Sequence, residues 1–353
     1  MAGLEGFAYY KEITISNTNV DADIANFPVY VSVVNDTDIG GHCIGTNGYD
    51  IQFANADNSE TLTFERIYWN NPAGTANGDF YVLVNPVDHD ANTVIRCYYG
   101  KSGETDHSSP ENTFATTNGW VAVWHLEEAS NPYLDATSNN HDSTAGVYPD
   151  RAAGKIGYGQ DFDDADSELI SIPDADDLDL ALSDITITAW IYQSDTSNHN
   201  IIFGKMGSPY PGYRTYLNYT PAKFRVDIGD SNGNIVLDSD SIVYADNWYH
   251  VGLSADRDST TGLHPIFNGV REREGSNITG IGDISSSEAF KIGQDCYGII
   301  DEVRVSNILR SDAWLKFEYY NSRDGHAVGN ELSWGSETPT AGPAEPIYLI
   351  WTK

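Results

Sequence analysis

The stretch Gly298–Asn307, with the sequence GIIDEVRVSN, places two adjacent carboxylates inside an apolar run. Its alternation of apolar and polar residues predicts a β-strand in which Val303 and Val305 share one face. Asp301 then falls on the valine face and Glu302 on the opposite face. Because an unpaired buried charge is too costly, a buried Asp301 must be hydrogen-bonded, ion-paired or metal-bound. The alternative is that Asp301 lies in water at the frayed start of the strand.

The composition predicts an all-β protein. The chain has 353 residues, enough for two domains with sizeable cores, and it is rich in Tyr (22), Trp (8) and Gly (32). Many short apolar runs are separated by Asn, Asp, Gly and Ser, as in strands joined by polar loops. One helix is expected, over residues 312–320, with Ser311 as its N-cap. Trp314, Leu315 and Tyr319 recur at helical spacing and would pin this helix against the neighbouring sandwich.

The charge of the chain is strongly negative. It carries 52 acidic and 19 basic residues, a net charge of -33. Phosphate binding needs Lys and Arg, so this balance argues against nucleic acid as a partner. It argues equally against an anionic membrane surface. Bound divalent cations, or a salty medium that screens charge, would relieve the self-repulsion of such a chain.

The cysteines and the N-terminus bear on the cellular compartment. Cys43 and Cys97 could pair within the first half of the chain, while Cys296 has no evident partner, and we favour buried thiols over bridges. We find no apolar signal segment near Met1 and no apolar run long enough to cross a membrane. We therefore expect no membrane insertion. Either a signal was replaced at Met1, or the protein leaves its cell without one, as a virion component released by lysis would.

The first hundred residues alternate between apolar runs and turn residues. The runs predict strands in the segments YYKEITISN, FPVYVSVVN, YDIQFANAD, LTFERIYWN, DFYVLVNPV and NTVIRCYYG. The motifs YYKEITISNT, FPVYVSV, DIQFANAD and VIRCYYG resemble an uncharacterised extracellular β domain over about residues 7–103. That domain commonly precedes a laminin-G-like jelly roll and brings no known activity. We expect a first β-sandwich domain over residues 1–103.

A polar segment and a second β unit follow. Residues 104–118 predict an interdomain linker, in which Pro110 breaks any regular element. The motifs WHLEE, LDATSNN, ITITAWI, WYHVGLSAD and IDEVRVSNILRSDAWLKFEYYN resemble the laminin-G-like, concanavalin A-like lectin/glucanase superfamily over about residues 120–322. The overall expectation is an all-β chain of two β-sandwich domains. The second, over residues 119–322, would be a concanavalin A-like jelly roll with one short C-terminal helix.

Residues 323–353 predict an extended C-terminal tail. Its last run, PIYLIWTK, alternates Ile347, Leu349 and Trp351 with other largely apolar residues. A free strand of this kind is an aggregation hazard and is rarely left uncovered. The Pro-rich stretch before it could act as an extended spacer. We therefore expect the tail to contact neighbouring subunits; the alternative is that its strand folds back on its own chain.

No catalytic constellation is visible in the sequence. A glucanase on this fold would need two carboxylates that flank a cleft. The superfamily's hydrolases place them on one strand as Glu-x-Asp-x-(x)-Glu, and the second domain lacks that spacing. Adjacent pairs such as Glu127-Glu128 point to opposite faces of a strand. We also find no nucleophile, metalloprotease or phosphate-loop motif, so we expect a protein that is not an enzyme.

Calcium is the metal that the second domain favours. Ca²⁺ takes oxygen ligands from carboxylates, amides and carbonyls, and the loop from Asp135 to Asn140 offers such oxygens. The resemblance implies one structural Ca²⁺ between this loop and the Asp-Glu pair of the last strand. Its ligands would be Asp135, Asn140 and Asp301 or Glu302. The alternative is that Asp301 caps the N–H groups of a neighbouring loop without a metal.

Sugar binding would need aromatic platforms with polar edges. The segment GSPYPGYRTYLNYT supplies four tyrosines, of which at least two would face the core. Tyr210, in the Pro-flanked loop, is the freer candidate for a ligand contact.

These observations combine into one prediction of function. We expect an externally displayed recognition or adhesion protein at an extracellular or virion surface, which binds a glycan or a surface protein. The alternative is a purely structural decoration or fibre subunit of a virus particle or surface filament. A glycan hydrolase is the third and least favoured reading.

Overall fold

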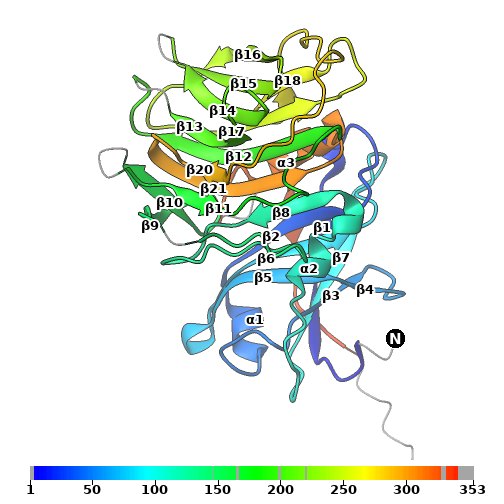
Figure 1. Cartoon of the computed structure of the whole chain (residues 1–353). Coiled ribbons are helices and arrows are strands. Elements are labelled where there is room, and N and C mark those ends of the chain that lie inside the picture. The colour runs from blue at the N-terminus through cyan, green and yellow to red at the C-terminus, as the bar shows by residue number, and fades with distance from the viewer. Residues whose placement is uncertain are drawn as a thin grey trace, which may run out of the picture.

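The computed structural model describes residues 4–144, 146–163, 167–197, 200–218, 221–326 and 331–340. It consists mainly of antiparallel strands in two β-sandwiches, with a short helix, α3, near the C-terminus of the second (Figure 1). The predicted fold class is therefore confirmed.

The first sandwich contains all the strands predicted from the first hundred residues. Its larger sheet has the order β22-β1-β7-β3-β4, with β23 also paired to β1, and its smaller sheet has the order β2-β6-β5. The strands are β1 (Tyr9–Ile15), β2 (Phe27–Asp36), β3 (Gln52–Asn55), β4 (Thr61–Leu62), β5 (Phe64–Asn70), β6 (Ala76–Val84), β7 (Thr93–Tyr99), β22 (Leu332–Trp334) and β23 (Thr338–Pro339). A short helix that we did not predict, α1 (Thr37–His42), begins after Asp36, whose carboxylate accepts from two backbone N–H groups.

The C-terminal segment belongs to the first sandwich. Strand β22 pairs with β1 so that Trp334 lies opposite Ile13, and β23 continues the pairing at Tyr10. The prediction of an extended tail outside both domains, from residue 323, is therefore wrong for residues 332–334 and 338–339, which are strands of the first sandwich. These residues cover an edge of the sheet that would otherwise expose unpaired N–H and C=O groups. The apolar run with Ile347, Leu349 and Trp351 lies outside the described residues.

The predicted linker, residues 104–118, is packed rather than extended. Ser109 N donates to the carbonyl of Phe64 at 2.8 Å, and Phe114 is fully buried. Pro110 begins the short helix α2 (Pro110–Thr113) instead of preventing one. Proline is tolerated in the first turn of a helix, because the N–H that it lacks would have no partner inside the helix.

The second sandwich is the jelly roll. Its eight-stranded sheet has the order β19-β18-β17-β12-β21-β10-β9, with β8 also paired to β21. These strands are β8 (Trp120–Trp124), β9 (Asp150–Ala153), β10 (Tyr158–Asp163), β12 (Ile185–Gln193), β17 (Trp248–Ala255), β18 (Leu263–Phe267), β19 (Val270–Arg271) and β21 (Tyr297–Ser306). The other sheet, which we call the distal sheet, has the order β11-β20-β13-β14-β15-β16. Its strands are β11 (Ile170–Ile172), β13 (Ile201–Met206), β14 (Gly212–Asn218), β15 (Lys223–Asp230), β16 (Gly233–Ile242) and β20 (Phe290–Ile292).

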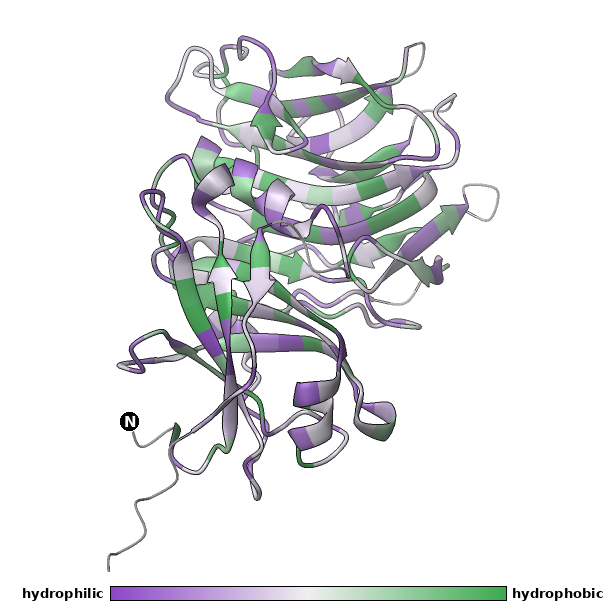
Figure 2. Ribbon diagram, turned by 180° about the vertical axis from the view of Figure 1, so that it is seen from behind, coloured by the Kyte–Doolittle hydropathy of each residue, from purple (hydrophilic) through white to green (hydrophobic). Residues whose placement is uncertain are grey.

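Helix α3 (Asp312–Ser322) lies between the two sandwiches. Ser311 accepts from the N–H of Trp314, so the predicted cap is confirmed. Trp314 and Phe317 pack against Phe27 of the first domain, with ring centroids 4.7 and 5.0 Å apart. The helix thus joins one apolar core that spans both domains, while the strands show the alternating hydropathy that was read from the sequence (Figure 2).

Strand β21 departs from regular alternation at its carboxylate pair. Its pairing with β12 slips, because Thr188 lies opposite Arg304 but Trp190 lies opposite Asp301. Glu302 sits in the bulge with a φ of 54°. Asp301 therefore shares a face with Trp190, away from the jelly-roll core, and not with Val303 as predicted. A bulge of this kind cannot be seen in a pattern that assumes strict alternation.

Two further expectations concern thiols and membranes. Cys97 and Cys296 are buried and Cys43 is partly buried, and all three are free thiols. Within the described residues, no helix has the length and apolar character needed to span a membrane.

Candidate functional site

The outer face of the distal sheet is a polar platform. Tyr213 and Leu217 of β14 point into the core and are fully buried. Arg214 and Tyr216 alternate with them and so point outward. Arg214 and Arg225 flank the Tyr216 ring at 5.1 and 5.7 Å from its centroid. The platform is therefore held by cation–π contacts and by ion pairs to acidic residues of β15 and β16.

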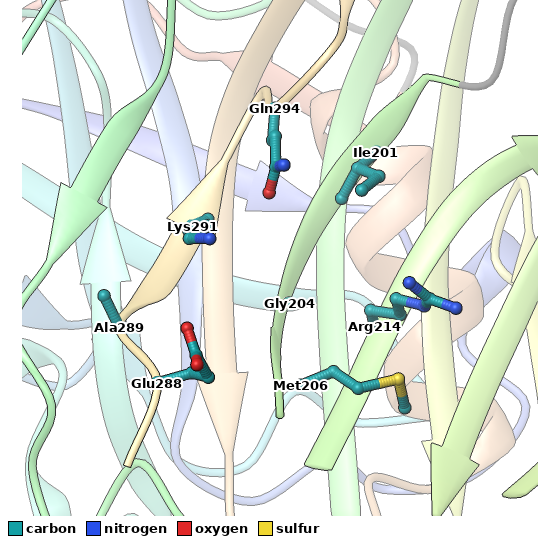
Figure 3. A pocket seen from close by; sticks show the side chains of 8 residues that line it. All are labelled: Ile201, Gly204, Met206, Arg214, Glu288, Ala289, Lys291 and Gln294. Atoms are coloured by element: carbon teal, nitrogen blue, oxygen red, sulfur yellow. The ribbon is translucent and has the colours of Figure 1, made fainter. Parts of the chain in front are cut away.

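A cleft opens in this platform at Gly204 of β13 (Figure 3). Gly204 pairs with Arg214 on one side and with Lys291 on the other. These two cationic side chains therefore flank the space that a side chain at position 204 would fill. A Cβ at position 204 would lie 2.4 Å from the Cβ of Arg214, which only glycine avoids. The cleft has a volume of about 50 Å³. It is lined by Ile201, Gly204, Met206, Arg214, Glu288, Ala289, Lys291 and Gln294.

Lys291 is the available cation of this cleft. Among the described residues it makes no hydrogen bond or ion pair, whereas Arg214 is bonded to Asp227 through two nitrogen atoms at 3.0 Å each. Glu288 and Gln294 add an acceptor and an amide at the rim. The cleft can therefore hold a polar ligand through both donors and acceptors.

Tyr210, the predicted ligand residue, lies in the loop that begins after Met206, a residue of the cleft. It is 40% exposed in the loop that follows Met206, where Gly207 N donates to the carbonyl of Pro211 at 2.7 Å. Tyr213 is buried, as expected for a core tyrosine, and its hydroxyl donates to the carbonyl of Leu178. Among the tyrosines of this segment that the structure describes, Tyr210 is therefore the most exposed.

The predicted calcium ligands have separate partners. Asp135 accepts from the N–H groups of Val123, Thr137 and His141 at 2.9 Å each, and from the hydroxyl of Thr137. Asn140 donates its side-chain amide to the carbonyl of Ser138. The loop is thus organised by its own hydrogen bonds, which occupy both oxygens of the Asp135 carboxylate.

The carboxylate pair of β21 is likewise committed. Oδ2 of Asp301 accepts from the N–H groups of Lys155 and Ile156 at 2.7 and 2.9 Å. Burial, with the neighbouring Glu302 charge, raises the pKa of Asp301 well above its usual value. Its Oδ1 is buried and has no hydrogen-bond partner among the described residues. Among the described residues, Asp135, Asp301 and Glu302 do not form a group whose ligand atoms lie within 4.8 Å of one another, and calcium binding stays a prediction.

A buried charged cluster that sequence reasoning missed joins the two domains. His125 lies between Glu302 of β21 and Glu65 of β5, with its Nδ1 and Nε2 at 2.9 and 3.1 Å from their carboxylates. Arg304 donates to Glu302 at 2.8 Å and also to the hydroxyl of Tyr81, whose ring stacks on His125 at 5.3 Å. The only hint in the sequence is a histidine directly after the apolar strand VAVW.

The ionisation of this cluster follows from its contacts. Burial alone would lower the pKa of His125, but Glu302 and Glu65 raise it well above its usual value. Burial opposes the ionisation of Glu302, but His125 and Arg304 outweigh it and lower its pKa. The cluster is therefore an ion-paired clamp between the domains.

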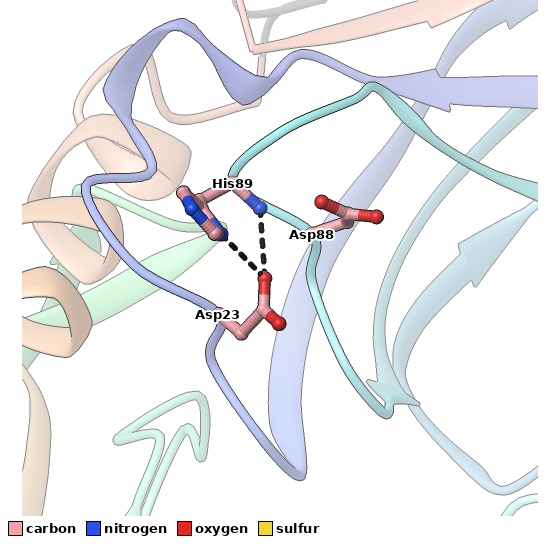
Figure 4. Close-up of side chains that lie close together, drawn as sticks. All are labelled: Asp23, Asp88 and His89. Carbon is pink, nitrogen blue, oxygen red and sulfur yellow. Dashed lines mark hydrogen bonds and ion pairs between the residues drawn. The ribbon is translucent and has the colours of Figure 1, made fainter.

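One exposed group of side chains has its potential metal-ligand atoms close together. The ligand atoms of Asp23, Asp88 and His89 lie within 4.8 Å of one another (Figure 4). His89 bonds Asp23 through Nδ1 at 2.8 Å. The Asp88 carboxylate accepts instead from the N–H groups of Asp90 and Ala91, and we assign no metal to this exposed group.

Comparison with known families confirms the predicted resemblance of the second domain. Residues 163–316 match the family described as the concanavalin A-like lectin/glucanases superfamily. The second domain therefore has a concanavalin A-like, lectin-like fold. No curated protein matches the chain.

Solved structures resemble the chain only weakly. Domain 4 of AbnA, an extracellular arabinanase of Geobacillus stearothermophilus solved with arabinotriose, is 19% identical with a TM-score of 0.42, over 56% of this chain and 96% of its own. The binding domain of botulinum neurotoxin serotype G is 13% identical with a TM-score of 0.43, over 57% of this chain and 50% of its own. The binding domain of botulinum neurotoxin DC, solved with rat synaptotagmin II, is 9% identical with a TM-score of 0.45, over 58% of this chain and 52% of its own. The chain thus spans about half of these toxin domains, and similarities at this level do not bear on its ligand.

Proposed function

We propose that this protein is an externally displayed, non-enzymatic recognition protein whose lectin-like domain binds a glycan at the cleft of the distal sheet. The observation that carries the proposal is the gap that Gly204 leaves between Arg214 and Lys291. A glycan presents hydroxyls, and often carboxylate or sulfate groups, to such donors.

The surroundings of the cleft support a glycan as the ligand. Met206 offers apolar surface and is followed by the loop with the exposed Tyr210, while Gln294 and Glu288 offer polar edges. Most ligand sites combine apolar lining with a few polar groups that fix orientation. Lys291 favours a glycan with an acidic substituent, because its ammonium is otherwise unpaired within the described part of the chain and would pair with an anion.

A glycan array probed with the full chain tests this proposal. We expect retention of a related set of glycans, weakened at least tenfold in a Lys291→Ala variant. The matched control is Lys223→Ala, which removes a cation from the same sheet; its ammonium donates to the carbonyl of Ser239, outside the cleft. Retention of no glycan, together with stable association with copies of itself or other surface proteins, would favour the purely structural alternative.

A further inference from the structure

A second pocket lies between the two domains. It has a volume of about 300 Å³, within the usual range for small-ligand sites, which often form at domain interfaces. Both domains and the turn after α3 contribute to it. Its lining residues are Tyr68, Asn77, Asp79, Glu127, Gly157, Tyr158 and His326.

The first domain supplies a fixed carboxylate. Asp79 of β6 is 1% exposed, accepts from the hydroxyl of Tyr30 at 2.6 Å and lies 2.8 Å from Nδ1 of His326. Tyr68, from the adjacent strand β5, meets the His326 ring edge to face at 6.5 Å. The turn at Gly325 allows this approach, because a Cβ there would lie 2.3 Å from the carbonyl oxygen of Lys155.

The second domain supplies Glu127 and Tyr158. Gln160 is fully buried and donates to the carbonyls of Leu126 and Glu128, which fixes the backbone on both sides of Glu127. Oε1 of Glu127 then accepts from the N–H of Tyr158 at 3.0 Å. Position 157 must be glycine for this contact, since a Cβ there would lie 2.0 Å from the same oxygen.

The two tyrosines frame the pocket. Tyr158 is 40% exposed, and the guanidinium of Arg151 lies 4.1 Å from the centroid of its ring. That contact orients the ring, which still lines the pocket together with Tyr68. Aromatic faces of this kind pack against the apolar faces of a sugar ring, while carboxyl and imidazole groups bond its hydroxyls.

The polar groups of the pocket balance one another in charge. Burial raises the pKa of Glu127 to about 8, so at neutral pH its carboxyl is protonated and can donate. The hydrogen bond to Asp79 raises the pKa of His326, which favours an ion pair between these two residues. Among the lining residues, a ligand that brings its own charge would find no unpaired counter-charge, whereas a neutral polyol would find donors and acceptors.

From this arrangement we infer a second binding site, between the domains, for an uncharged pyranose or furanose sugar. The site is independent of the distal cleft, because it shares no residue with that cleft and belongs to both domains. It would let the first domain take part in recognition, beyond its role in packing.

Saturation-transfer difference NMR on the full chain, with glucose, galactose, mannose and arabinose as probes, tests this site. We expect at least one sugar to bind in the millimolar range, and Tyr158→Ala to weaken it at least tenfold. Tyr158 is part-exposed, so its truncation leaves the core intact. Tyr68→Ala provides a second variant, from the other domain, that should have the same effect.

Tyr210→Ala and Lys291→Ala are the controls that separate the two sites. Both lie at the distal sheet, so they should leave this binding unchanged even if the distal cleft binds no glycan. The inference is overturned if none of the four sugars gives a saturable signal. It is equally overturned if the signal survives both Tyr158→Ala and Tyr68→Ala.

Discussion

Nδ1 of His125 lies 2.9 Å from Oε1 of Glu302, and Nε2, on the opposite edge of the imidazole ring, contacts Glu65 of the first domain. The raised pKa of His125 means that the folded state binds its proton more tightly than the unfolded state does. Its contribution to stability is therefore fully present below the unfolded pKa of about 6.5 and is lost as pH rises through the folded pKa.

The first prediction is an alkaline loss of stability that depends on His125. The free energy of unfolding in urea should fall as pH rises above about 6.5 in the wild type. His125→Gln should lower it by about 3 kcal/mol at pH 7, because breaking a buried pair leaves carboxylates uncompensated. The variant should then lose less than the wild type on raising the pH. Parallel pH profiles for the two proteins would show that His125 is not the titrating group.

The second prediction concerns Glu127, whose pKa is raised to about 8 by burial. A raised carboxyl pKa means that stability falls as pH rises from about 4.5 towards 8, because the unfolded chain ionises first. Glu127→Gln keeps an acceptor for Tyr158 N but cannot ionise. It should stabilise the protein by about 3 kcal/mol at pH 7 and have little effect at pH 4. Equal stability of the two proteins at both pH values would mean that Glu127 ionises normally.

A third prediction tests the C-terminal strands. A chain that ends at Asn330 lacks β22 and β23 and should melt several degrees lower, since β1 loses the partners opposite Ile13 and Tyr10. A chain that ends at Thr340 keeps both strands and should melt like the wild type. If the run with Trp351 contacts neighbouring subunits, the second truncation should lower the native mass of the assembly and leave the melting temperature unchanged. An unchanged melting temperature in the shorter chain would show that β22 and β23 add no stability.

Calcium separates two accounts of the β21 carboxylates. The resemblance predicts that millimolar Ca²⁺ raises the melting temperature, as any ligand specific to the folded state does. The hydrogen bonds of Asp135 and Asp301 predict no change on adding EGTA, and they predict that Asp301→Ala destabilises the chain by about 2 kcal/mol because two N–H groups lose their acceptor. Differential scanning calorimetry with and without EGTA distinguishes the two. A rise in melting temperature on adding calcium, which Asp135→Asn abolishes, would establish the metal site.

Much of the fold could be predicted because its signals are local. Alternating runs marked the strands, and Ser311 marked the start of α3. The bulge at Glu302 could not be predicted, because it places a non-glycine residue at positive φ inside a regular pattern. The strands at Trp334 could not be either, because their partner lies more than 300 positions earlier in the chain.

The candidate sites were less predictable than the fold. Tyr210 was identified from its loop, but the cleft depends on Gly204 lying between Arg214 and Lys291, which is a matter of strand register. The interdomain pocket and the His125 clamp combine residues from both domains. No spacing in the sequence links them, since only the packing of one domain on the other brings them together.

The central claim is that the distal cleft binds a glycan. Hydrogen–deuterium exchange of the full chain, with and without the best ligand from the array, tests it most directly. The account predicts slower exchange in β13, β14, β20 and the loop that carries Tyr210, and no such effect in Lys291→Ala. Slower exchange confined to other strands, or none at saturating ligand, would contradict it.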